Sequence, residues 1–348
     1  MILELDGLGH RYDTEQAVDT VSFGIADGEL LGLLGPSGCG KTTIVQAIAG
    51  HLQPTAGRVR LRGTDVTTDP PESRHVAVVF QQSTLFDHMT VADNVAYGLA
   101  ADAGTVADFL DLVSLTDQQS AYPAELSGGQ QRRAELARAL ATDPDVLLLD
   151  EPLSALDRAL RTEIRAEIGR LQRETGVTTL FVTHDQSDAM ALADRLVVMD
   201  NGAVAGVGEP RTLYASPPTP FVADFLGRST TLQATVSDQQ PLTLRVGDTR
   251  LGFDARRTAL PTGTPVTCYL RPSDLRLQPS PELPSLPCEP VDVVDAGRHY
   301  DVTVALDTGE RLLVESQTQP PVGTATQVGI PQATMSIFPA DEGAANDQ

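Results

Sequence analysis

The N-terminal half of the sequence contains a glycine-rich motif that ends in a lysine and a threonine, Gly35-Pro36-Ser37-Gly38-Cys39-Gly40-Lys41-Thr42. It fits the pattern G-x-x-x-x-G-K-[ST], in which backbone N–H groups turn inward around phosphate oxygens. We expect Lys41 to reach the β- and γ-phosphates of a nucleotide and Thr42 to ligate Mg²⁺. An apolar run, Leu30–Leu34, precedes the motif and a helical pattern from Thr42 to Ala49 follows it, which is the strand–loop–helix context that the motif requires.

Lys41 is the only lysine in the chain, because 24 of the 25 Lys and Arg residues are arginines. An ammonium is a compact point charge that fits inside such a loop, whereas a guanidinium is planar and bulkier. A chain that uses arginine everywhere else and keeps lysine here favours a phosphate site over a chance glycine-rich turn.

A second candidate site follows the apolar run Val146–Leu149, which ends in Asp150 and Glu151. An acid at the carboxyl end of a parallel strand lies at the crevice where ligands bind. We expect Asp150 to hold Mg²⁺ and Glu151 to polarise a water molecule toward the γ-phosphate. Taken alone, such a pair could end any strand of an acidic protein; the phosphate motif makes the functional interpretation the stronger one.

A second glycine-rich turn opens a second helix at Leu126-Ser127-Gly128-Gly129-Gln130. Its N–H groups would form another anion cradle. One chain does not need two cradles for one triphosphate. A turn supplied by a second chain, closing over the γ-phosphate, explains both.

The composition limits the partners. The chain has 348 residues, with 47 acidic against 25 basic ones and a net charge of −22. Such a field repels nucleic acid and acidic lipid surfaces. Two interpretations of the acidity stay open: adaptation to a salt-rich cytoplasm, and GC-rich codons that favour arginine over lysine. The spacing of the cysteines matches neither a disulfide framework nor a zinc site. No run is apolar for long enough to span a membrane and no secretory pattern is present, so we expect a cytoplasmic chain whose membrane partners do the spanning.

Residues 1–231 alternate short apolar runs with helical patterns, which predicts a parallel sheet with helices on both faces. Leu160, Ile164, Ile168 and Leu171 form one helical stripe that ends at Gly176. Residues 86–143 read as an inserted helical unit. The predicted strands are Leu30–Leu34, His75–Phe80, Val146–Asp150, Val177–Thr183 and Arg195–Asp200, and the clearest inserted helices are Val106–Val113 and Arg132–Ala141.

From residue 232 to 340 the helical patterns disappear and strand-like segments follow one another, which predicts a small β-barrel or a pair of barrels. Prolines at 279, 281, 284, 287 and 290 suggest a stiff linker between two halves. Residues 341–348 are predicted to be a frayed tail. The strands predicted here are Thr231–Val236, Leu242–Val246, Val266–Leu270, Val291–Val294, Tyr300–Leu306 and Arg311–Glu315.

Five motifs stand in the order and approximate spacing of the ABC-transporter ATPase subunits: Gly35–Thr42, Leu126–Gln130, Val146–Glu151, Ser154-Ala155-Leu156-Asp157 and His184. Residues 150–227 look most like importer ATPases of the maltose, polyamine and ferric-iron group. The resemblance implies an ABC ATPase domain of the P-loop fold over residues 1–231, followed over 232–340 by a β domain of the oligonucleotide-barrel (TOBE) type that regulates or dimerises.

The resemblance also implies residue roles. Tyr12 would stack on the adenine of ATP, and Thr43 would touch the α-phosphate beside the loop Gly35–Thr42. Gln81 would sense Mg²⁺ and the attacking water, and His184 would hold the γ-phosphate. Across a homodimer, the γ-phosphate would contact Ser127, Gly128, Gly129 and Gln130, and Asp157 would couple the two sites. Metal contacts would come from Thr42, Gln81 and Asp150. Tyr12 could instead be an ordinary strand-end aromatic, His184 a polar residue at a strand end, and Gln82 could take the role of its neighbour.

Three residues depart from the group's pattern. Glu135 stands where an apolar residue is usual, which is harmless if it is exposed and requires a partner if it is buried. Asp87 replaces a common proline and Ser83 a common aromatic in the segment Gln82–Met89, which normally contacts the membrane subunit.

The resemblance implies an ATPase that works as a homodimer with two integral membrane permease subunits at the cytoplasmic face of the membrane, and indirectly with an extracytoplasmic solute-binding protein. The sequence slightly favours ferric iron or polyamine over sugar or oxyanion as cargo. The alternative is a soluble ABC ATPase that acts on nucleic acid or ribosomes, which the net charge opposes. The C-terminal domain is either a sensor or a dimer brace.

Overall fold

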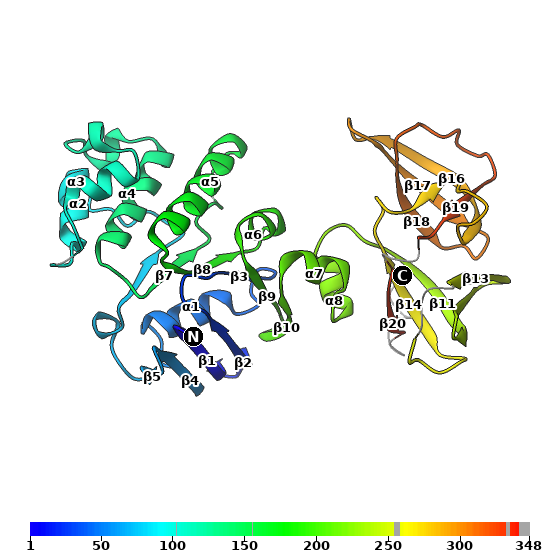
Figure 1. Cartoon of the computed structure of the whole chain (residues 1–348), viewed down its shortest axis with the longest axis horizontal. Helices are drawn as coiled ribbons and strands as arrows, with labels where there is room; N and C mark the ends of the chain where they lie inside the picture. The colour runs from blue at the N-terminus through cyan, green and yellow to red at the C-terminus, as the bar shows by residue number, and fades with distance from the viewer. Residues whose placement is uncertain (102, 155, 254–257, 332–334, 341–348) are drawn as a thin grey trace. The chain divides into compact units, whose positions relative to one another are not determined.

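The computed structural model describes residues 1–101, 103–154, 156–253, 258–331 and 335–340 (Figure 1). The chain folds into two compact units, Met1–Arg211 and Thr212–Gln348. The first unit thus ends before the domain boundary predicted at residue 231, because α8 (Pro220–Phe225) packs on β14 (Pro265–Leu270) of the second unit. The predicted tail lies outside the described residues. None of the described helices is long and apolar enough to cross a membrane.

The first unit is built on a six-stranded sheet in which every neighbouring pair is parallel except the edge pair β10–β9. All five strands predicted for this region are present within one or two residues, because their continuous apolar residues are buried on both faces. In sheet order the strands are β10 (Ala203–Gly208), β9 (Arg195–Asp200), β3 (Leu30–Leu34), β8 (Thr178–Thr183), β7 (Val146–Asp150) and β6 (Val76–Val79).

A second, antiparallel sheet covers one face of α1 (Lys41–Ala49), which lies between the two sheets (Figure 1). The sequence analysis did not predict this sheet. Its first hairpin carries three register shifts, and such bulges break the alternation of apolar and polar residues that marks a strand. In sheet order its strands are β2 (Glu15–Ile25), β1 (Leu3–Tyr12), β4 (Ala56–Leu61) and β5 (Thr64–Asp65).

Helices cover the other face of the parallel sheet and form a second core with it. The predicted helical insertion is present, and its longest helix begins at Gly128 rather than at Arg132, because Ser127 and Gln130 form a capping box. The helices of this unit after α1 are α2 (Val91–Gly98), α3 (Val106–Leu112), α4 (Gly128–Ala141), α5 (Arg158–Thr175) and α6 (Gln186–Leu192). Helix α5 ends at Gly176 with φ 67°, as predicted. Short 3-10 turns lie at Pro71–Ser73, Thr116–Gln118 and Pro123–Glu125, and α7 (Pro210–Ala215) begins at the end of this unit and continues into the second.

The β region of the second unit consists of two five-stranded antiparallel sheets around one apolar core. The first sheet has the order β13 (Thr249–Phe253), β12 (Leu242–Val246), β11 (Thr230–Gln239), β14 and β20 (Ser336–Pro339). The second has the order β15 (Arg276–Leu277), β19 (Thr326–Gly329), β16 (Ser285–Asp295), β17 (Tyr300–Leu306) and β18 (Arg311–Ser316). All six predicted strands are found here.

The predicted proline linker is wrong over part of its length, because Pro287 and Pro290 lie inside β16. This strand pairs on both sides, with β19 and with β17. A register shift between Pro290 and Asp292 interrupts the pairing with β17, and a bulge is one of the few places where a strand accepts a proline.

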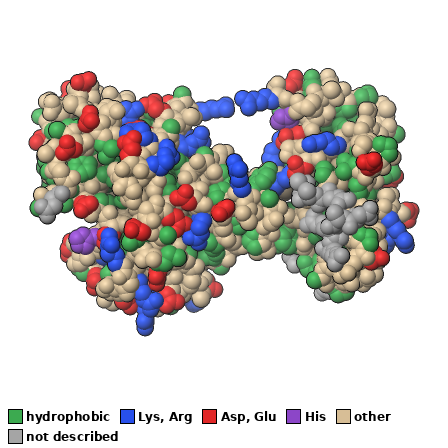
Figure 2. Space-filling model, in the orientation of Figure 1, with side chains coloured by type: hydrophobic (Ala, Val, Ile, Leu, Met, Phe, Trp, Pro, Cys, Tyr) green, Lys and Arg blue, Asp and Glu red, His purple; other side chains and the backbone are tan. Residues whose placement is uncertain are grey.

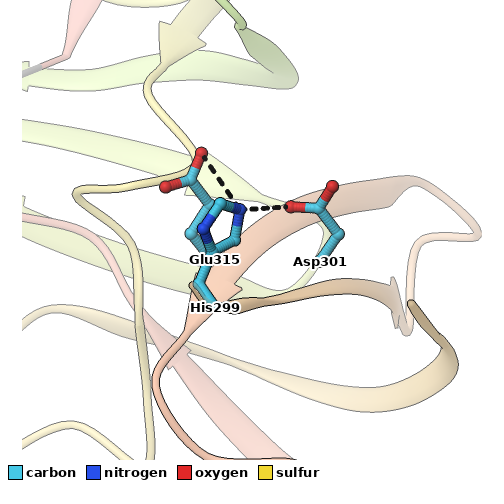
Figure 3. Close-up of side chains that lie close together, drawn as sticks. All are labelled: His299, Asp301 and Glu315. Atoms are coloured by element: carbon cyan, nitrogen blue, oxygen red, sulfur yellow. Dashed lines mark hydrogen bonds and ion pairs between the residues drawn. The ribbon is translucent and has the colours of Figure 1, made fainter. Parts of the chain in front are cut away.

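A polar cluster brings together His299, which directly precedes β17, Asp301 of β17 and Glu315 of β18 (Figure 3). His299 Nε2 lies 3.0 Å from an Asp301 oxygen, and these three residue types are common metal ligands. Arg228, however, donates two hydrogen bonds to Asp301 and forms an ion pair with Glu315. The guanidinium thus already neutralises the carboxylates, and the cluster is an ionic link between the segment after α8 and the second sheet.

Acidic and basic side chains are interspersed over the face of the molecule that Figure 2 presents. This distribution agrees with the excess of acids, which extends along the whole sequence. Arg271, in contrast, is buried and donates to the carbonyls of Ala223 and Arg228, so it fastens the segment around α8 to the end of β14.

Candidate nucleotide site

The glycine-rich loop joins β3 to α1, and two of its glycines lie where no side chain fits. A Cβ on Gly40, whose φ is 97°, would lie 2.4 Å from the carbonyl oxygen of Ala17. A Cβ on Gly35 would lie 2.6 Å from the carbonyl oxygen of Met199. Close packing on both sides therefore requires glycine at these positions, and the loop delivers Lys41 and Thr42 to the first turn of the helix.

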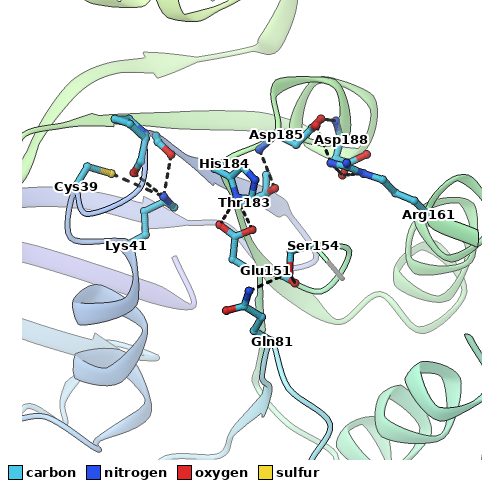
Figure 4. Close-up of polar contacts among 12 residues, drawn as sticks. Cys39, Lys41, Gln81, Glu151, Ser154, Arg161, Thr183, His184, Asp185 and Asp188 are labelled. Atoms are coloured by element: carbon cyan, nitrogen blue, oxygen red, sulfur yellow. Dashed lines mark hydrogen bonds and ion pairs between the residues drawn. The ribbon is translucent and has the colours of Figure 1, made fainter. Parts of the chain in front are cut away.

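Lys41 is buried, with 7% of its surface exposed, and its ammonium points into its own loop (Figure 4). Nζ donates to the carbonyl oxygens of Gly35, at 2.8 Å, and Pro36, at 2.9 Å. The Cys39 sulfur lies 4.0 Å away, and burial raises the pKa of this thiol, so it stays protonated at neutral pH. Thr42 is exposed beside the lysine, whereas Thr43 is buried in the same helical turn.

Asp150 is the last residue of β7 and has an oxygen without a partner. Its side chain is buried and, within the described part of the chain, no group hydrogen-bonds to Oδ1. Burial, reinforced by the neighbouring charge of Glu151, raises the pKa of this carboxyl, and Lys41 and Arg132 oppose the shift. A buried oxygen with an unsatisfied lone pair at this position is suited to a cation.

The three residues predicted to hold the metal fit Mg²⁺ by their chemistry. The hydroxyl of Thr42, the amide of Gln81 and the carboxylate of Asp150 all offer oxygen, which is the ligand atom that Mg²⁺ prefers. The partnerless Oδ1 of Asp150 is the structural observation that supports this assignment.

Glu151, His184 and Gln81 come together at one edge of the sheet (Figure 4). Glu151 follows β7 with a φ of 50°, and the Nδ1 atom of His184, which follows β8, lies 2.9 Å from its Oε1. Gln81 donates to the hydroxyl of Ser154 at 3.2 Å, and that hydroxyl donates to the backbone carbonyl of Glu151 at 3.0 Å. Because the imidazole contacts the carboxylate directly, a water molecule could be bound beside this pair but not between its two members.

The structure does not bring the second glycine-rich turn to the phosphate loop. No hydrogen bond or ion pair between described residues joins Ser127–Gln130 to Gly35–Thr43. The turn caps α4 instead, because the hydroxyl of Ser127 accepts a hydrogen bond from the backbone N–H of Gln130 at 3.3 Å. A Cβ on Gly129 would lie 2.5 Å from a Leu160 methyl carbon, whereas a Cβ on Gly128 would meet nothing within 4 Å. One side of the turn is therefore packed and the other is open.

Tyr12 and Asp157 lie at the ends of other elements. Tyr12 ends β1, is 45% exposed and meets the ring of His10 edge to face at 4.5 Å between centroids. Asp157 is the N-cap of α5 and accepts from the amides of Ala159 and Leu160. Ala155, in the motif before Asp157, lies outside the described residues.

Two contacts near the site are not predicted from the sequence. Ser154 is the first residue of the motif that ends at Asp157, and its hydroxyl joins Gln81 to Glu151. Nothing in the sequence predicts this contact. The unusual Glu135 is buried, at 3% exposed, and its partner is Arg132, at 2.7 Å. Because the two residues are three apart on a helix, their spacing could have revealed the pair.

A groove of about 600 Å³ lies next to this pair. Its walls come from β6, α2, α4 and the segment between β6 and α2. The side chains of Phe86, Tyr97, Glu135 and Arg138 line it. Phe86 meets Tyr97 edge to face, and the guanidinium of Arg138 lies over the Phe86 ring. Tyr97 is 68% exposed, so an apolar and aromatic wall faces solvent here.

Comparison with known proteins identifies clear relatives. The family profile described as "ABC transporter" matches residues 18–154. The sulfate/thiosulfate import ATP-binding protein CysA 2 of Chromobacterium violaceum is 39% identical, over 97% of this chain and 96% of its own. The spermidine/putrescine import ATP-binding protein PotA of Ruegeria pomeroyi is 42% identical, over 89% of this chain and 86% of its own.

A solved structure gives the same picture of the fold. It is the ADP conformation of an ATP-binding cassette of an ABC transporter, superposes with a TM-score of 0.58 and is 25% identical. The match covers 64% of this chain and 97% of that one.

Proposed function

The chain belongs to the ATP-binding subunits of ABC importers, which hydrolyse ATP to energise solute uptake, and we propose that it binds ATP between two head-to-tail copies of itself. The loop Gly35–Thr43 of one copy would meet the turn Ser127–Gln130 of the other. Two observations support this arrangement: the turn makes no hydrogen bond or ion pair with the loop of its own chain among the described residues, and its Gly128 side is open. Asp157, two residues beyond Ala155, would couple the two sites.

The observation that carries the catalytic assignment is the meeting of Glu151, His184 and Gln81 at the edge of the sheet beside Lys41. We assign Glu151 to orient the attacking water by accepting its hydrogen bond, and His184 to contact the γ-phosphate and hold the Glu151 carboxylate in place. Gln81 would contact the same water and the Mg²⁺ ion. Catalysis in such a site is positioning and charge stabilisation.

The nucleotide would be held by a separate set of groups. Lys41 would leave the carbonyls of Gly35 and Pro36 for the β- and γ-phosphates, the loop amides would bind phosphate oxygens, and Thr43 would lie at the α-phosphate. Tyr12, exposed at the end of β1, would stack on the adenine.

Mg²⁺ would be held by Thr42, Asp150 and Gln81. When it is bound, the ion neutralises the charge that develops on the transferred phosphoryl group. The orphaned oxygen of Asp150 is what supports the site in this chain.

Import ATP-binding subunits work with membrane permease components, and we assign the groove beside Phe86 and Tyr97 to that contact. An exposed aromatic wall with charged groups at its base suits a short amphipathic helix of a permease subunit. The chain would then act as a peripheral protein at the cytoplasmic face of the membrane, with a solute-binding protein on the other side and no nucleic acid.

The cargo stays a prediction. Relatives of similar identity are named for sulfate/thiosulfate and for spermidine/putrescine, so identity alone does not select the solute. The residues of the candidate site would bind ATP and not the transported solute, which explains why relatives with different solutes are about equally similar in sequence. Ferric iron or polyamine is our prediction, and uptake of radiolabelled putrescine, ferric iron and sulfate by cells with and without the gene tests it.

Glu151→Gln tests the function. The variant is expected to bind ATP and Mg²⁺ with parent affinity, to lose turnover by at least a hundredfold, and to accumulate as an ATP-bound dimer in size-exclusion chromatography. Glu163→Gln is the matched control, because this exposed glutamate on α5 forms its ion pair, among the described residues, with Arg133 alone. Parent-level ATPase activity in Glu151→Gln would remove Glu151 from its assigned role.

A further inference from the structure

Helix α4 binds the segment that carries Gln81 with three charged side chains spaced three residues apart. Arg132 donates to the carbonyl of Phe80 at 2.7 Å. Glu135 accepts from the backbone N–H of Thr84 at 2.7 Å, and Arg138 donates to the Thr84 carbonyl at 2.8 Å. The segment Phe80–Thr84 is therefore held at both ends by one helix.

Arg132 also reaches the other side of the site. Its Nε atom donates to the carbonyl of Pro152 at 2.9 Å, and Pro152 directly follows Glu151. One guanidinium thus joins the backbone beside Gln81 to the backbone beside Glu151. Its planar fork of N–H groups allows this, because a single side chain can bond two carbonyls and a carboxylate in different directions.

Arg132 and Glu135 are both buried and lie 2.7 Å apart. A buried ion pair gives little net stability compared with apolar residues of the same volume, because both charges lose their hydration. Folding stability therefore does not explain the pair. The hydrogen bonds of the pair instead fix the positions of the Phe80–Thr84 segment and the turn at Pro152 relative to helix α4.

We propose that Arg132 and Glu135 are positioning residues for ATP hydrolysis, which tie the Gln81 segment and the Glu151 turn to α4. Helix α4 begins at the turn Ser127–Gln130, so a nucleotide of the second copy that engages this turn moves both loops together. The inference rests on the proposed function, because it takes the roles of Gln81, Glu151 and the turn from it.

The charged residues of α4 that hold the Gln81 segment also line the groove beside Phe86 and Tyr97. Glu135 and Arg138 lie at its wall, and Arg138 contacts both Thr84 and Phe86. A permease helix seated there presses on the same segment that Glu135 holds. The pair thus joins the permease contact to the reacting end of the nucleotide through hydrogen bonds alone.

The central test replaces both charges at once, with Arg132→Met and Glu135→Leu in one chain, so that no unpaired buried charge is left. This variant is expected to keep the parent melting temperature and the parent KM for ATP, while kcat falls by about tenfold to a hundredfold, because misplaced catalytic groups affect attack rather than binding. The Thr84 amide, which loses Glu135, is expected to exchange its hydrogen at least tenfold faster. Glu163→Gln, which breaks an ion pair to the same helix, is expected to keep kcat within twofold.

Arg132→Lys is the second variant, and it keeps the charge opposite Glu135 without the planar fork. It is expected to fold and to lose kcat at unchanged KM, and it decides the question if the double variant does not fold. Parent kcat in a folded double variant, or in Arg132→Lys, would overturn the proposal. So would a fall in kcat with unchanged exchange at Thr84. None of these results touches the assignment of Glu151, which the loss of turnover in Glu151→Gln tests separately.

Discussion

The imidazole of His184 lies against the carboxylate of Glu151, with Nδ1 2.9 Å from Oε1, although the two residues follow different strands. β7 and β8 are parallel neighbours, so their carboxyl ends deliver both side chains to the same edge. The positive φ of Glu151 turns its carboxylate toward the histidine.

This contact predicts the effect of His184→Ala. We expect kcat to fall by about a hundredfold, because the carboxylate loses the group that orients it and the γ-phosphate loses a donor. The affinity for ATP, measured with a fluorescent analogue, should stay within threefold. A variant that lost affinity but kept kcat would place His184 in binding alone.

Lys41→Arg is predicted to abolish function without a change of charge. Lys41 is buried and donates to the carbonyls of Gly35 and Pro36, and we expect the bulkier guanidinium not to fit there. We expect the affinity for ATP to fall by about tenfold or more, measured by calorimetry. The matched control is Arg58→Lys in an exposed ion pair, which should bind ATP as the parent does. Parent affinity in Lys41→Arg would show that the loop accommodates the fork.

Asp150→Asn separates stability from catalysis. Burial raises the pKa of Asp150, which means that the folded state favours the protonated carboxyl over the ionised one. The stability that the protonated form contributes is present below the unfolded-state pKa and is lost as pH rises through the raised folded-state pKa. Removing the charge should therefore leave the melting temperature at neutral pH equal to or above that of the parent. Turnover should fall by at least a hundredfold and stop responding to Mg²⁺, just as removal of Mg²⁺ by a chelator should stop the parent. A lower melting temperature in Asp150→Asn would contradict the electrostatic account.

Asp301→Asn is predicted to weaken the second unit. Arg228 holds the pKa of Asp301 below its usual value, with a smaller contribution from His299. A lowered acid pKa gives stability that is present above the unfolded pKa near 4 and is lost as pH falls through the folded pKa. We expect Asp301→Asn to cost about 1 kcal/mol at pH 7 and progressively less as the pH falls through the lowered folded-state pKa, measured by denaturant unfolding at neutral and at acid pH. An equal cost at both pH values would assign the effect to packing.

The phosphate loop and the parallel sheet could be predicted because their evidence is local. A buried parallel strand is a continuous apolar run, and the loop needs glycine where Gly35 and Gly40 stand. The antiparallel sheet could not be predicted, because the bulges in β1 interrupt the alternation of apolar and polar residues that marks a strand. Prolines 287 and 290 suggested a linker, and only the pairing of β16 with two neighbours shows that the chain continues as a strand.

Within the site, residue types could be predicted and most contacts could not. The motif predicts Glu151 and the family resemblance implies His184 and Gln81, whereas the Ser154 hydroxyl that joins Gln81 to Glu151 depends on the path of the turn after β7. Burial decided the case of Glu135, because the sequence alone left an exposed and a buried side chain equally open. The roles proposed for Ser127–Gln130 depend on a second copy, which no single chain contains.

The solitary lysine has a practical consequence for chemistry on this protein. Its side chain is the only one in the sequence that carries a primary amine, and only 7% of the surface of this residue is exposed. Acylating reagents therefore have one internal target, and the rate at which they modify it reports whether the loop is closed on itself, opened, or filled. Mass spectrometry of the one peptide that contains Lys41, followed over time, would then measure the occupancy of the site without a label attached beforehand.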